Sequence, residues 1–191
     1  MKTTFEKVSA LNLAFGNSKG DVLNPDPATV LKQAALCLEE AVEMIQEGFP
    51  GVKLVLGVDA KGRQVVTLDK SAWDGQVDLV QVLDAQGDMT TVNDGVAHIV
   101  GVDGNRVYDI VDASNRTKFI RCQEEVAPAL QYYFDKGFNR GDLYLEGDFP
   151  EMCIKVTADI TVQGKFYPRD KFLKNVATFK EPDFSEILAG E

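Results

Sequence analysis

Cysteine and histidine are scarce in this chain of 191 residues, which has three cysteines and one histidine. Cys37, Cys122 and Cys153 form no C-x-x-C pair, so neither a disulfide framework nor a zinc site is expected. No apolar run reaches the ~20 residues of a membrane span, and residues 1–19 lack the apolar core of a signal peptide. We therefore expect a soluble protein of the reducing cytoplasm, without a membrane partner.

Basic residues are outnumbered, since 20 lysines and arginines face 30 aspartates and glutamates, for a net charge of −10. Such a chain repels a phosphate backbone, so we expect no nucleic-acid partner. A free nucleotide held through a metal ion is compatible with this charge. The length suffices for one domain with a core of its own, or for one domain with a small appendage.

The segment Pro27–Gly48 has the period of an amphipathic helix, which Pro27 begins and Gly48 ends. Glu39, Glu40 and Glu43 project away from its apolar stripe. A glutamate-rich face can simply be solvated, but apolar residues among these carboxylates favour a covered face. There, like charges ~4 Å apart repel by about 4 kcal/mol at an effective dielectric of 20, and a divalent cation would remove the conflict. The stripe comprises Val30, Leu31, Ala34, Ala35, Leu38, Ala41, Val42 and Ile45.

A second helix is predicted from Val82 to Val100. Asp84 and Asp88 are neighbours on one side of it, because residues four apart share a helical face. A solvated face and a metal site are both open readings of these aspartates. Gly87 and Gly95 each weaken a helix by ~1 kcal/mol relative to alanine, which suggests that a neighbouring backbone or ligand comes close.

Several motifs follow one another in a set order: Glu39-Glu40-x-x-Glu43, Asp84-Ala-Gln-Gly-Asp88, Gly95, Gly101-Val-Asp and Ser114-Asn115-Arg-Thr-Lys118. In this order the chain resembles the MazG-like nucleotide pyrophosphohydrolases. The likeness is to the phage and bacterial branch related to phosphoribosyl-ATP pyrophosphohydrolase and the dimeric dUTPases. It covers roughly residues 5–120, with a weaker echo in residues 174–188.

The resemblance implies a mainly α fold, with a four-helix core in a single domain of residues 1–191 and β insertions at about 50–72 and 150–168. Alternating apolar residues on both sides of Asp59-Ala-Lys-Gly62 predict a β-hairpin in the first insertion. Alternation over 152–166 predicts a second β segment, for which the hairpin is a candidate partner. Further helices are predicted from Asp103 to about Asn115 and over 123–136.

The resemblance also implies cleavage of a nucleoside triphosphate between its α and β phosphorus atoms, which releases the monophosphate and pyrophosphate. Glu39 is the candidate general base, although it and Glu40 could exchange roles. The family usually has an acidic residue where this chain has Ala85, so Asp84 would serve from one residue further back. Mg²⁺, with Mn²⁺ as a possible substitute, would be held by Glu40, Glu43, Asp84 and Asp88.

Substrate contacts fall to polar residues outside these two helices. In the family, the residues matching Asn115 and Lys118 contact nucleotide and phosphate; on their own they would read as a helix cap and a solvated lysine. Asn17 is a further candidate for base contact. Lys174 belongs to a basic tail that is either solvated or a flap closing over phosphates. The single histidine, His98, is expected to be structural or on the surface.

The family's members assemble as dimers or dimers of dimers, so a homodimer or homotetramer is expected. A purine deoxynucleotide such as dGTP or dATP is slightly favoured as substrate, because the insertions depart from the plain dUTPase pattern. Alternatives are a dUTPase-like pyrimidine hydrolase and an enzyme acting on a phosphoribosyl nucleotide. An alternative that is not an enzyme is a catalytically inactive helical protein that binds nucleotide or a partner. Ala85 supports this alternative, because it stands where the family has an acidic residue.

Overall fold

The computed structural model describes residues 1–59 and 62–190. It divides into two compact units, where the sequence predicts a single domain. The first unit comprises Met1–Val107 together with the end of the chain from Ser185, and the second comprises Tyr108–Phe184. Within the described residues, no helix combines the length and the apolar character needed to cross a membrane.

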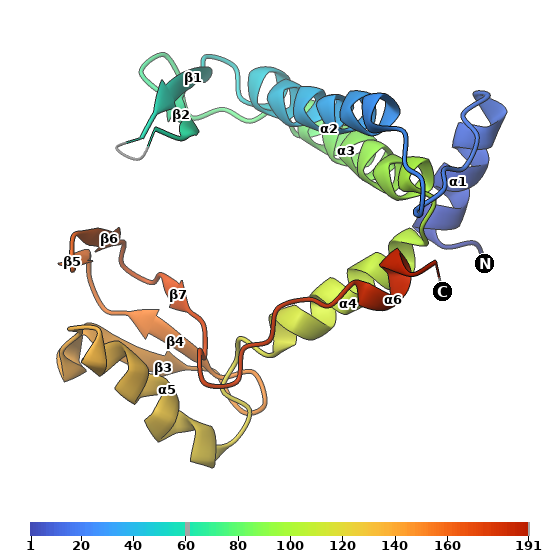
Figure 1. Cartoon of the computed structure of the whole chain (residues 1–191). Coiled ribbons are helices and arrows are strands. Elements are labelled where there is room, and N and C mark those ends of the chain that lie inside the picture. The colour runs from blue at the N-terminus through green and yellow to red at the C-terminus, as the bar shows by residue number, and fades with distance from the viewer. Residues whose placement is uncertain (60–61, 191) are drawn as a thin grey trace. The chain divides into compact units, whose positions relative to one another are not determined.

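Helices dominate the first unit (Figure 1). Helix α1 (Thr4–Ala14), which the sequence analysis did not predict, begins at a capping box in which Thr3 and Glu6 each accept the other's backbone N–H. Helices α2 (Pro27–Gly48) and α3 (Leu79–Val100) confirm the two predicted carboxylate-bearing helices. Strands β1 (Lys53–Val58) and β2 (Gln64–Asp69) confirm the hairpin, although residues 60–61 of its predicted turn lie outside the described residues. Helix α6 is Ser185–Leu188.

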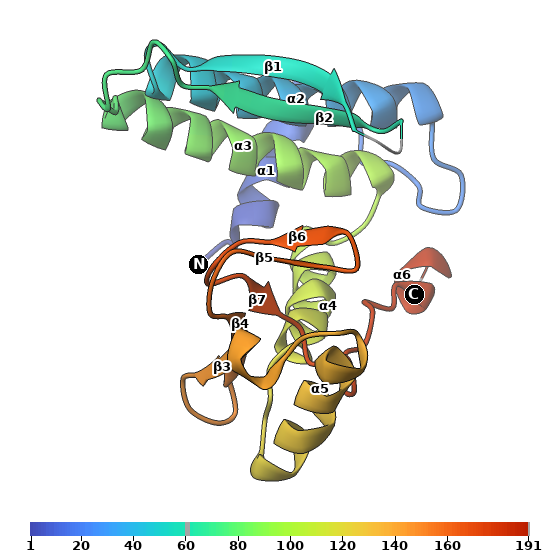
Figure 2. The same cartoon turned by 90° about the vertical axis from the view of Figure 1, so that its left-hand side faces the viewer.

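Helices α2 and α3 run antiparallel and side by side, as both views show (Figure 1, Figure 2). At one end, the Asp78 N–H donates to the Gly48 carbonyl at 2.9 Å. Towards the other end, Gln33 Nε2 donates to the Val92 carbonyl at 3.0 Å. A Cβ on Gly95 would lie 2.5 Å from Gln33 Nε2, so the glycine is what admits this side chain. The close approach predicted at Gly95 is therefore confirmed.

The second unit combines helix and sheet. Helix α4 (Gly104–Arg116) enters it from the first unit and is followed by α5 (Gln123–Asp135) and the short 3₁₀ helix η1 (Arg140–Asp142). Three antiparallel strands form one sheet in the order β3 (Leu143–Glu146), β4 (Cys153–Val156), β7 (Phe172–Leu173). Strands β5 (Ile160–Val162) and β6 (Lys165–Tyr167) form a separate hairpin.

A continuous hydrophobic core lies between α5 and these strands. Ile120, Ile154 and Val156 have at most 1% of their surface exposed. Asn175 is equally buried and donates to the Phe119 carbonyl and to Glu125. The other members of the core are Ala129, Tyr133, Phe138, Leu143, Val162 and Leu173. Because these residues come from segments more than 50 positions apart but all within the second unit, that unit has a core that does not depend on α2 and α3.

The predicted fold class, a mainly α protein with a four-helix core, is wrong. The described residues form six α-helices and three small sheets, a mixed α/β architecture. The physical reason lies in α5, which corresponds to the helix predicted over 123–136. Its apolar side chains Ala129 and Tyr133 are buried against the strands of the second unit instead.

The predicted β segment over 152–166 is confirmed as β structure, in three short strands, because β4 ends at Val156, β5 spans Ile160–Val162 and β6 spans Lys165–Tyr167. Its predicted pairing is wrong. It does not pair with the 53–69 hairpin: β4 pairs with β3 and β7, and β1 pairs with β2. In addition, the apolar stripe of α2 is not all in a core, since Leu31 and Leu38 are 72% and 64% exposed.

Two glycines of the α3 region should respond to alanine in opposite directions. Gly101 ends α3 with φ +95°, and a Cβ there would clash with the Gly20 carbonyl oxygen, so Gly101→Ala should cost about 2–3 kcal/mol. A Cβ on Gly87 meets no described atom within 4 Å, so Gly87→Ala should add about 1 kcal/mol through helix propensity. Urea unfolding measures both, and an unchanged Gly101→Ala protein would contradict the packing described.

Candidate functional site

The predicted metal ligands lie on the paired helices of the first unit. The contacts between Gln33 and Val92 and between Gly48 and Asp78 fix the register of α2 against α3. Because both helices rise by ~1.5 Å per residue, equal steps from these contacts bring Glu40 to the level of Ala85 and Gln86, and Glu43 to that of Val82 and Leu83. Asp88 and Asp84 lie within one helical turn, ~5 Å, of these two levels. The antiparallel packing thus brings into one stretch of the helix pair acidic residues that are 41 or more positions apart in sequence.

Electrostatic effects at Glu40 support this alignment. Burial raises the pKa of Glu40, and the negative charges of Glu43, Asp88, Glu39 and Asp84 raise it further, in that order. The other four predicted acidic residues therefore all lie within electrostatic reach of Glu40. Their repulsion favours any ligand that brings positive charge.

The acidic residues have no cationic partner among the residues that the structure describes. Glu39, Glu43, Asp84 and Asp88 are exposed and Glu40 is partly buried, and none of the five forms an ion pair with a lysine or arginine. Their oxygens are the ligand type that Mg²⁺ prefers. In the same described part of the chain, however, no three of the acidic, histidine or cysteine side chains are close enough together to hold a metal ion. The donor chemistry fits Mg²⁺, but the donors are spread along the two helices.

Ala85 and Cys37 show how the packing limits the site. Ala85, at the position where the related family has an acidic residue, is only 9% exposed. A carboxylate there would be buried beside Asp84 and Asp88, at the cost of desolvation and repulsion. Burial raises the pKa of the Cys37 thiol, and the charge of Glu40 adds to this, so Cys37 is suited to packing rather than to nucleophilic attack.

Asn17 lies near the start of α2 and not beside the acidic residues. It lines a surface hollow together with Asp26 and Thr29, and Glu40 is ~16 Å further along the helix from Thr29. Its side chain donates to Asn12 Oδ1 at 3.1 Å, and its carbonyl lies 2.9 Å from His98 Nε2. These contacts give Asn17 a role in holding the loop before α2.

His98 is fully buried, which agrees with the expected structural role. Its ring bridges two segments, since Nδ1 lies 2.9 Å from Ser9 Oγ and Nε2 lies 2.9 Å from the Asn17 carbonyl. The histidine thereby links α3 to α1 and to the loop before α2. Both ring nitrogens are engaged in these contacts, so His98 is not a metal ligand.

The other predicted substrate residues come together in the second unit. Lys118 Nζ donates to Asn115 Oδ1 at 2.6 Å and lies 5.8 Å from the centre of the Phe179 ring. Lys174 Nζ lies 3.6 Å from the same ring centre. Asn115, Lys118 and Lys174 thus surround Phe179, whereas the acidic residues belong to the first unit.

Sequence reasoning missed the partners of Lys174 on α5. Lys174 lines a cavity of about 320 Å³ together with Tyr132, Tyr133 and Lys136 of that helix. The signal available in the sequence was the spacing of Tyr132 and Lys136, which four-residue steps place on one face of a helix. Lys136 Nζ lies 5.1 Å from the centre of the Tyr132 ring.

The raised pKa of Glu40 predicts how stability changes with pH. A carboxyl whose pKa is higher in the folded state destabilises the fold once it ionises, above the ordinary value of about 4.3. Glu40→Gln stays neutral and should be more stable than the parent at pH 7 by about 0.2–0.5 kcal/mol. The difference should vanish below about pH 4, as urea unfolding at the two pH values would show.

Asp26, at the start of the same helix, provides the control of opposite sign. Hydrogen bonds from Thr29 and from the Ala28 N–H lower the pKa of Asp26, so its charge stabilises the fold above its ordinary pKa. Asp26→Asn should be less stable than the parent at pH 7, and the loss should fade as the pH falls through the lowered pKa. A Glu40→Gln protein that is less stable at pH 7 would contradict the repulsion inferred here.

Comparison with protein-family models, with curated proteins and with solved structures finds no match to this chain. The likeness to MazG-like enzymes therefore rests on the ordered motifs alone. Any functional conclusion depends on what the residues of the two units can do.

Proposed function

We propose that this chain is a Mg²⁺-dependent nucleoside triphosphate pyrophosphohydrolase that converts a (d)NTP to the (d)NMP and pyrophosphate, with a purine deoxynucleotide preferred. The observation that carries the proposal is that the charges of Glu43 on α2 and of Asp84 and Asp88 on α3 all act on Glu40, while none of these four residues has a cationic partner in the described residues. The ordered motifs that resemble MazG-like enzymes support the same activity.

In this proposal Glu40, Glu43, Asp84 and Asp88 hold Mg²⁺. When bound, the metal supplies positive charge that offsets the charge of the triphosphate. Binding would draw together acidic side chains that now repel one another across α2 and α3. Because four of the five are exposed, they can turn towards a common ion without unpacking the helices.

The attacking water needs a carboxylate to accept its proton. Glu39 has this role in the proposal, and Glu40 is the alternative. The raised pKa of Glu40 favours it chemically, since a more basic carboxylate is a better proton acceptor as long as it is ionised at the working pH. Glu39, which is more exposed, is placed better to reach bulk water.

Asn115, Lys118 and Lys174 are proposed to contact the nucleotide. Lys118 already donates to Asn115 Oδ1, which leaves the Asn115 amide nitrogen to donate to a base or sugar. The ammonium groups of Lys118 and Lys174 have no carboxylate partner among the described residues, so both can bind phosphate.

One observation favours a second candidate, a catalytically inactive protein that binds nucleotide or a partner. In the described chain the acidic side chains do not converge into a metal-sized cluster, and the position of a family ligand is the buried Ala85. A protein that has lost catalysis would tolerate both features. The two candidates differ in turnover.

Product analysis tests the activity. The purified protein is incubated with Mg²⁺ and each NTP and dNTP in turn, and monophosphate with pyrophosphate is resolved from diphosphate with orthophosphate. We expect the first pair of products, with loss of turnover in EDTA. Glu43→Gln should lower kcat at least 100-fold. The matched control is Glu47→Gln on the same helix, which does not contribute to the raised pKa of Glu40 and should keep full activity.

The possible results separate the candidates. Diphosphate and orthophosphate would mean a different phosphohydrolase. No turnover of any nucleotide by a folded protein would favour the inactive binding protein. Equal activity of Glu43→Gln and the parent would remove the acidic residues from the mechanism.

Self-association is proposed as well, with a second copy of the chain as the partner. Leu31 and Leu38 lie two turns apart on α2 and are largely exposed, as are three apolar residues at the start of α3: Leu79, Val80 and Leu83. Exposed apolar surface on adjacent helices is typical of homo-oligomers, in which a second copy covers it.

Light scattering during gel filtration tests this association. The parent should elute as a dimer or tetramer, and the double variant Leu31→Lys/Leu38→Lys should elute as a monomer. The control Leu13→Lys/Leu188→Lys adds the same charge at two other exposed leucines, 57% and 61% exposed, and should leave the assembly unchanged. A parent protein that is monomeric at micromolar concentration would contradict this part of the proposal.

A further inference from the structure

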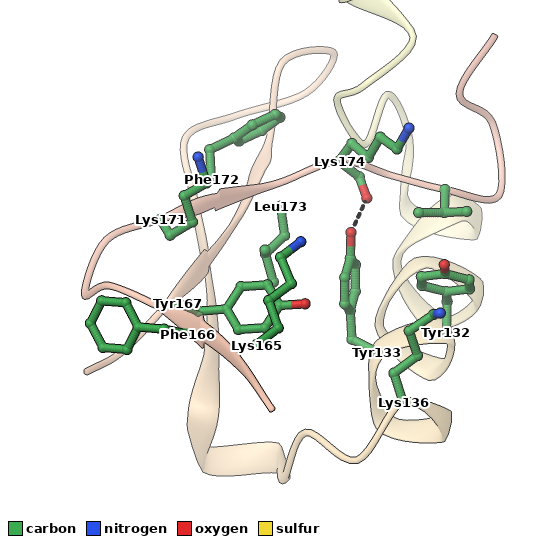
Figure 3. Close-up of a pocket in the computed structure, with 11 residues that line it drawn as sticks. Tyr132, Tyr133, Lys136, Lys165, Phe166, Tyr167, Lys171, Phe172, Leu173 and Lys174 are labelled. Atoms are coloured by element: carbon green, nitrogen blue, oxygen red, sulfur yellow. Dashed lines mark hydrogen bonds between the residues drawn. The ribbon is translucent and has the colours of Figure 1, made fainter. Parts of the chain in front are cut away.

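The second unit contains a cavity in which only Lys174 belongs to the residues proposed to contact the hydrolysed nucleotide. It has a volume of about 320 Å³, near the lower limit of typical ligand pockets, ~300–1,000 Å³. One side is formed by α5 with Tyr132, Tyr133 and Lys136, and the opposite side by β6 with Lys165 and Tyr167, as Figure 3 shows. Its remaining residues are Phe166, Lys171, Phe172, Leu173, Lys174 and Val176.

The charge of this cavity is entirely positive. Lys136, Lys165, Lys171 and Lys174 line it, and no aspartate or glutamate does. Among the residues that the structure describes, none of these four lysines forms an ion pair, whereas Lys155 of the same unit pairs with Glu146. Such a concentration of lysines stands out in a chain with net charge −10. Their mutual repulsion is relieved by a bound anion.

Aromatic rings lie next to these charges. Lys136 Nζ is 5.1 Å from the ring centre of Tyr132, and Lys165 Nζ is 4.9 Å from that of Tyr167. A ligand with both a planar ring and an anionic group can therefore stack on a tyrosine while its charge meets the adjacent ammonium.

The base of the cavity is held in place by buried contacts. Tyr133, only 6% exposed, donates its hydroxyl proton to the Lys174 carbonyl at 2.6 Å. Phe138 packs edge-on against both Tyr133 and Tyr167, with ring centres 5.6 and 5.0 Å apart. The two walls of the cavity are thus connected through the core. Because the backbone around the cavity is already held in place, binding a ligand costs little additional ordering of the protein.

We propose that this cavity is a binding site for a compound that joins phosphate to a planar aromatic ring, which is the chemistry of a nucleoside phosphate. The lysines bind the phosphate groups and the tyrosines bind the ring. Apart from Lys174, none of the residues that line the cavity takes part in the proposed hydrolase activity, and none of them is acidic, so the site can bind its ligand without the proposed metal site. A free nucleotide fits better than a nucleic-acid strand, since the net charge of −10 repels a long polyanion.

Isothermal titration calorimetry with ATP in EDTA tests the site without metal-dependent turnover. We expect ATP to bind the parent and Glu43→Gln equally. The charge reversal Lys136→Glu/Lys165→Glu should weaken ATP binding at least tenfold. Its control, Lys2→Glu/Lys7→Glu, makes the same charge change at two exposed lysines of the first unit and should bind as the parent does. Circular dichroism verifies folding, and the milder Lys136→Gln/Lys165→Gln replaces the reversal if that variant does not fold.

The ring is tested separately. Tyr132→Leu should weaken ATP binding severalfold and leave binding of inorganic tripolyphosphate unchanged. Tyr108→Leu, at a tyrosine that is 69% exposed and outside the cavity, is its control and should change neither.

Other results would overturn the proposal. If the parent and the charge-reversal variant bind ATP equally, Lys136 and Lys165 do not bind its phosphate groups. Tripolyphosphate binding as tight as ATP binding excludes recognition of the ring. Binding of a thymidine oligonucleotide without binding of ATP would assign the surface to a nucleic-acid strand instead.

Discussion

The close packing of α2 against α3 is the constraint on which the first unit depends. Glycine lies at two points of close approach: a Cβ on Gly95 would lie 2.5 Å from Gln33 Nε2, and a Cβ on Gly48 would lie 2.5 Å from Val82 Cγ2. These two contacts set the register of the helices, and the register decides which acidic residues meet. A shift by one helical turn, ~5.4 Å, would bring different residues of α3 to the level of Glu40. The polar site is therefore a consequence of how apolar and glycine positions pack.

That packing leaves two unfavourable features in the first unit. The negative charges around Glu40 repel one another, and leucines such as Leu31 and Leu38 are exposed to solvent. A helix pair buries only one stripe of each helix, so the opposite faces must meet water or another partner. The second unit differs, because its strands and α5 enclose a core in which Ile120 and Val156 are fully buried. A metal ion and a second copy of the chain are the partners proposed for the first unit. The metal ion would offset the repulsion among the acidic residues, and the second copy would cover the exposed leucines.

Sequence reasoning succeeded where local chemistry decides structure and failed where distant segments do. The bounds of α2 could be predicted because Pro27 and Gly48 act within one turn of the helix ends. Exposure of Leu38 could not be predicted, since periodicity identifies an apolar stripe but not whether anything covers it. Gly87 was expected to admit a close neighbour, as Gly95 does, yet a Cβ there would meet no described atom within 4 Å. A glycine inside a predicted helix can thus have a close neighbour, as Gly95 does, or none, as at Gly87, and the sequence alone does not distinguish the two.

Each unit contains one local set of like charges that is not neutralised by the described residues of that unit: the acidic residues around Glu40 in the first, and the lysines that line the cavity in the second. Acidic residues around Glu40 have no cationic partner among the described residues, and the same holds, with signs reversed, for Lys136 and Lys165. An ion that binds to such unpaired charge in the folded protein, but does not bind to the unfolded chain, stabilises the folded state. The first set gains from a cation and the second from an anion. Each unit therefore has its own electrostatic reason to bind a ligand.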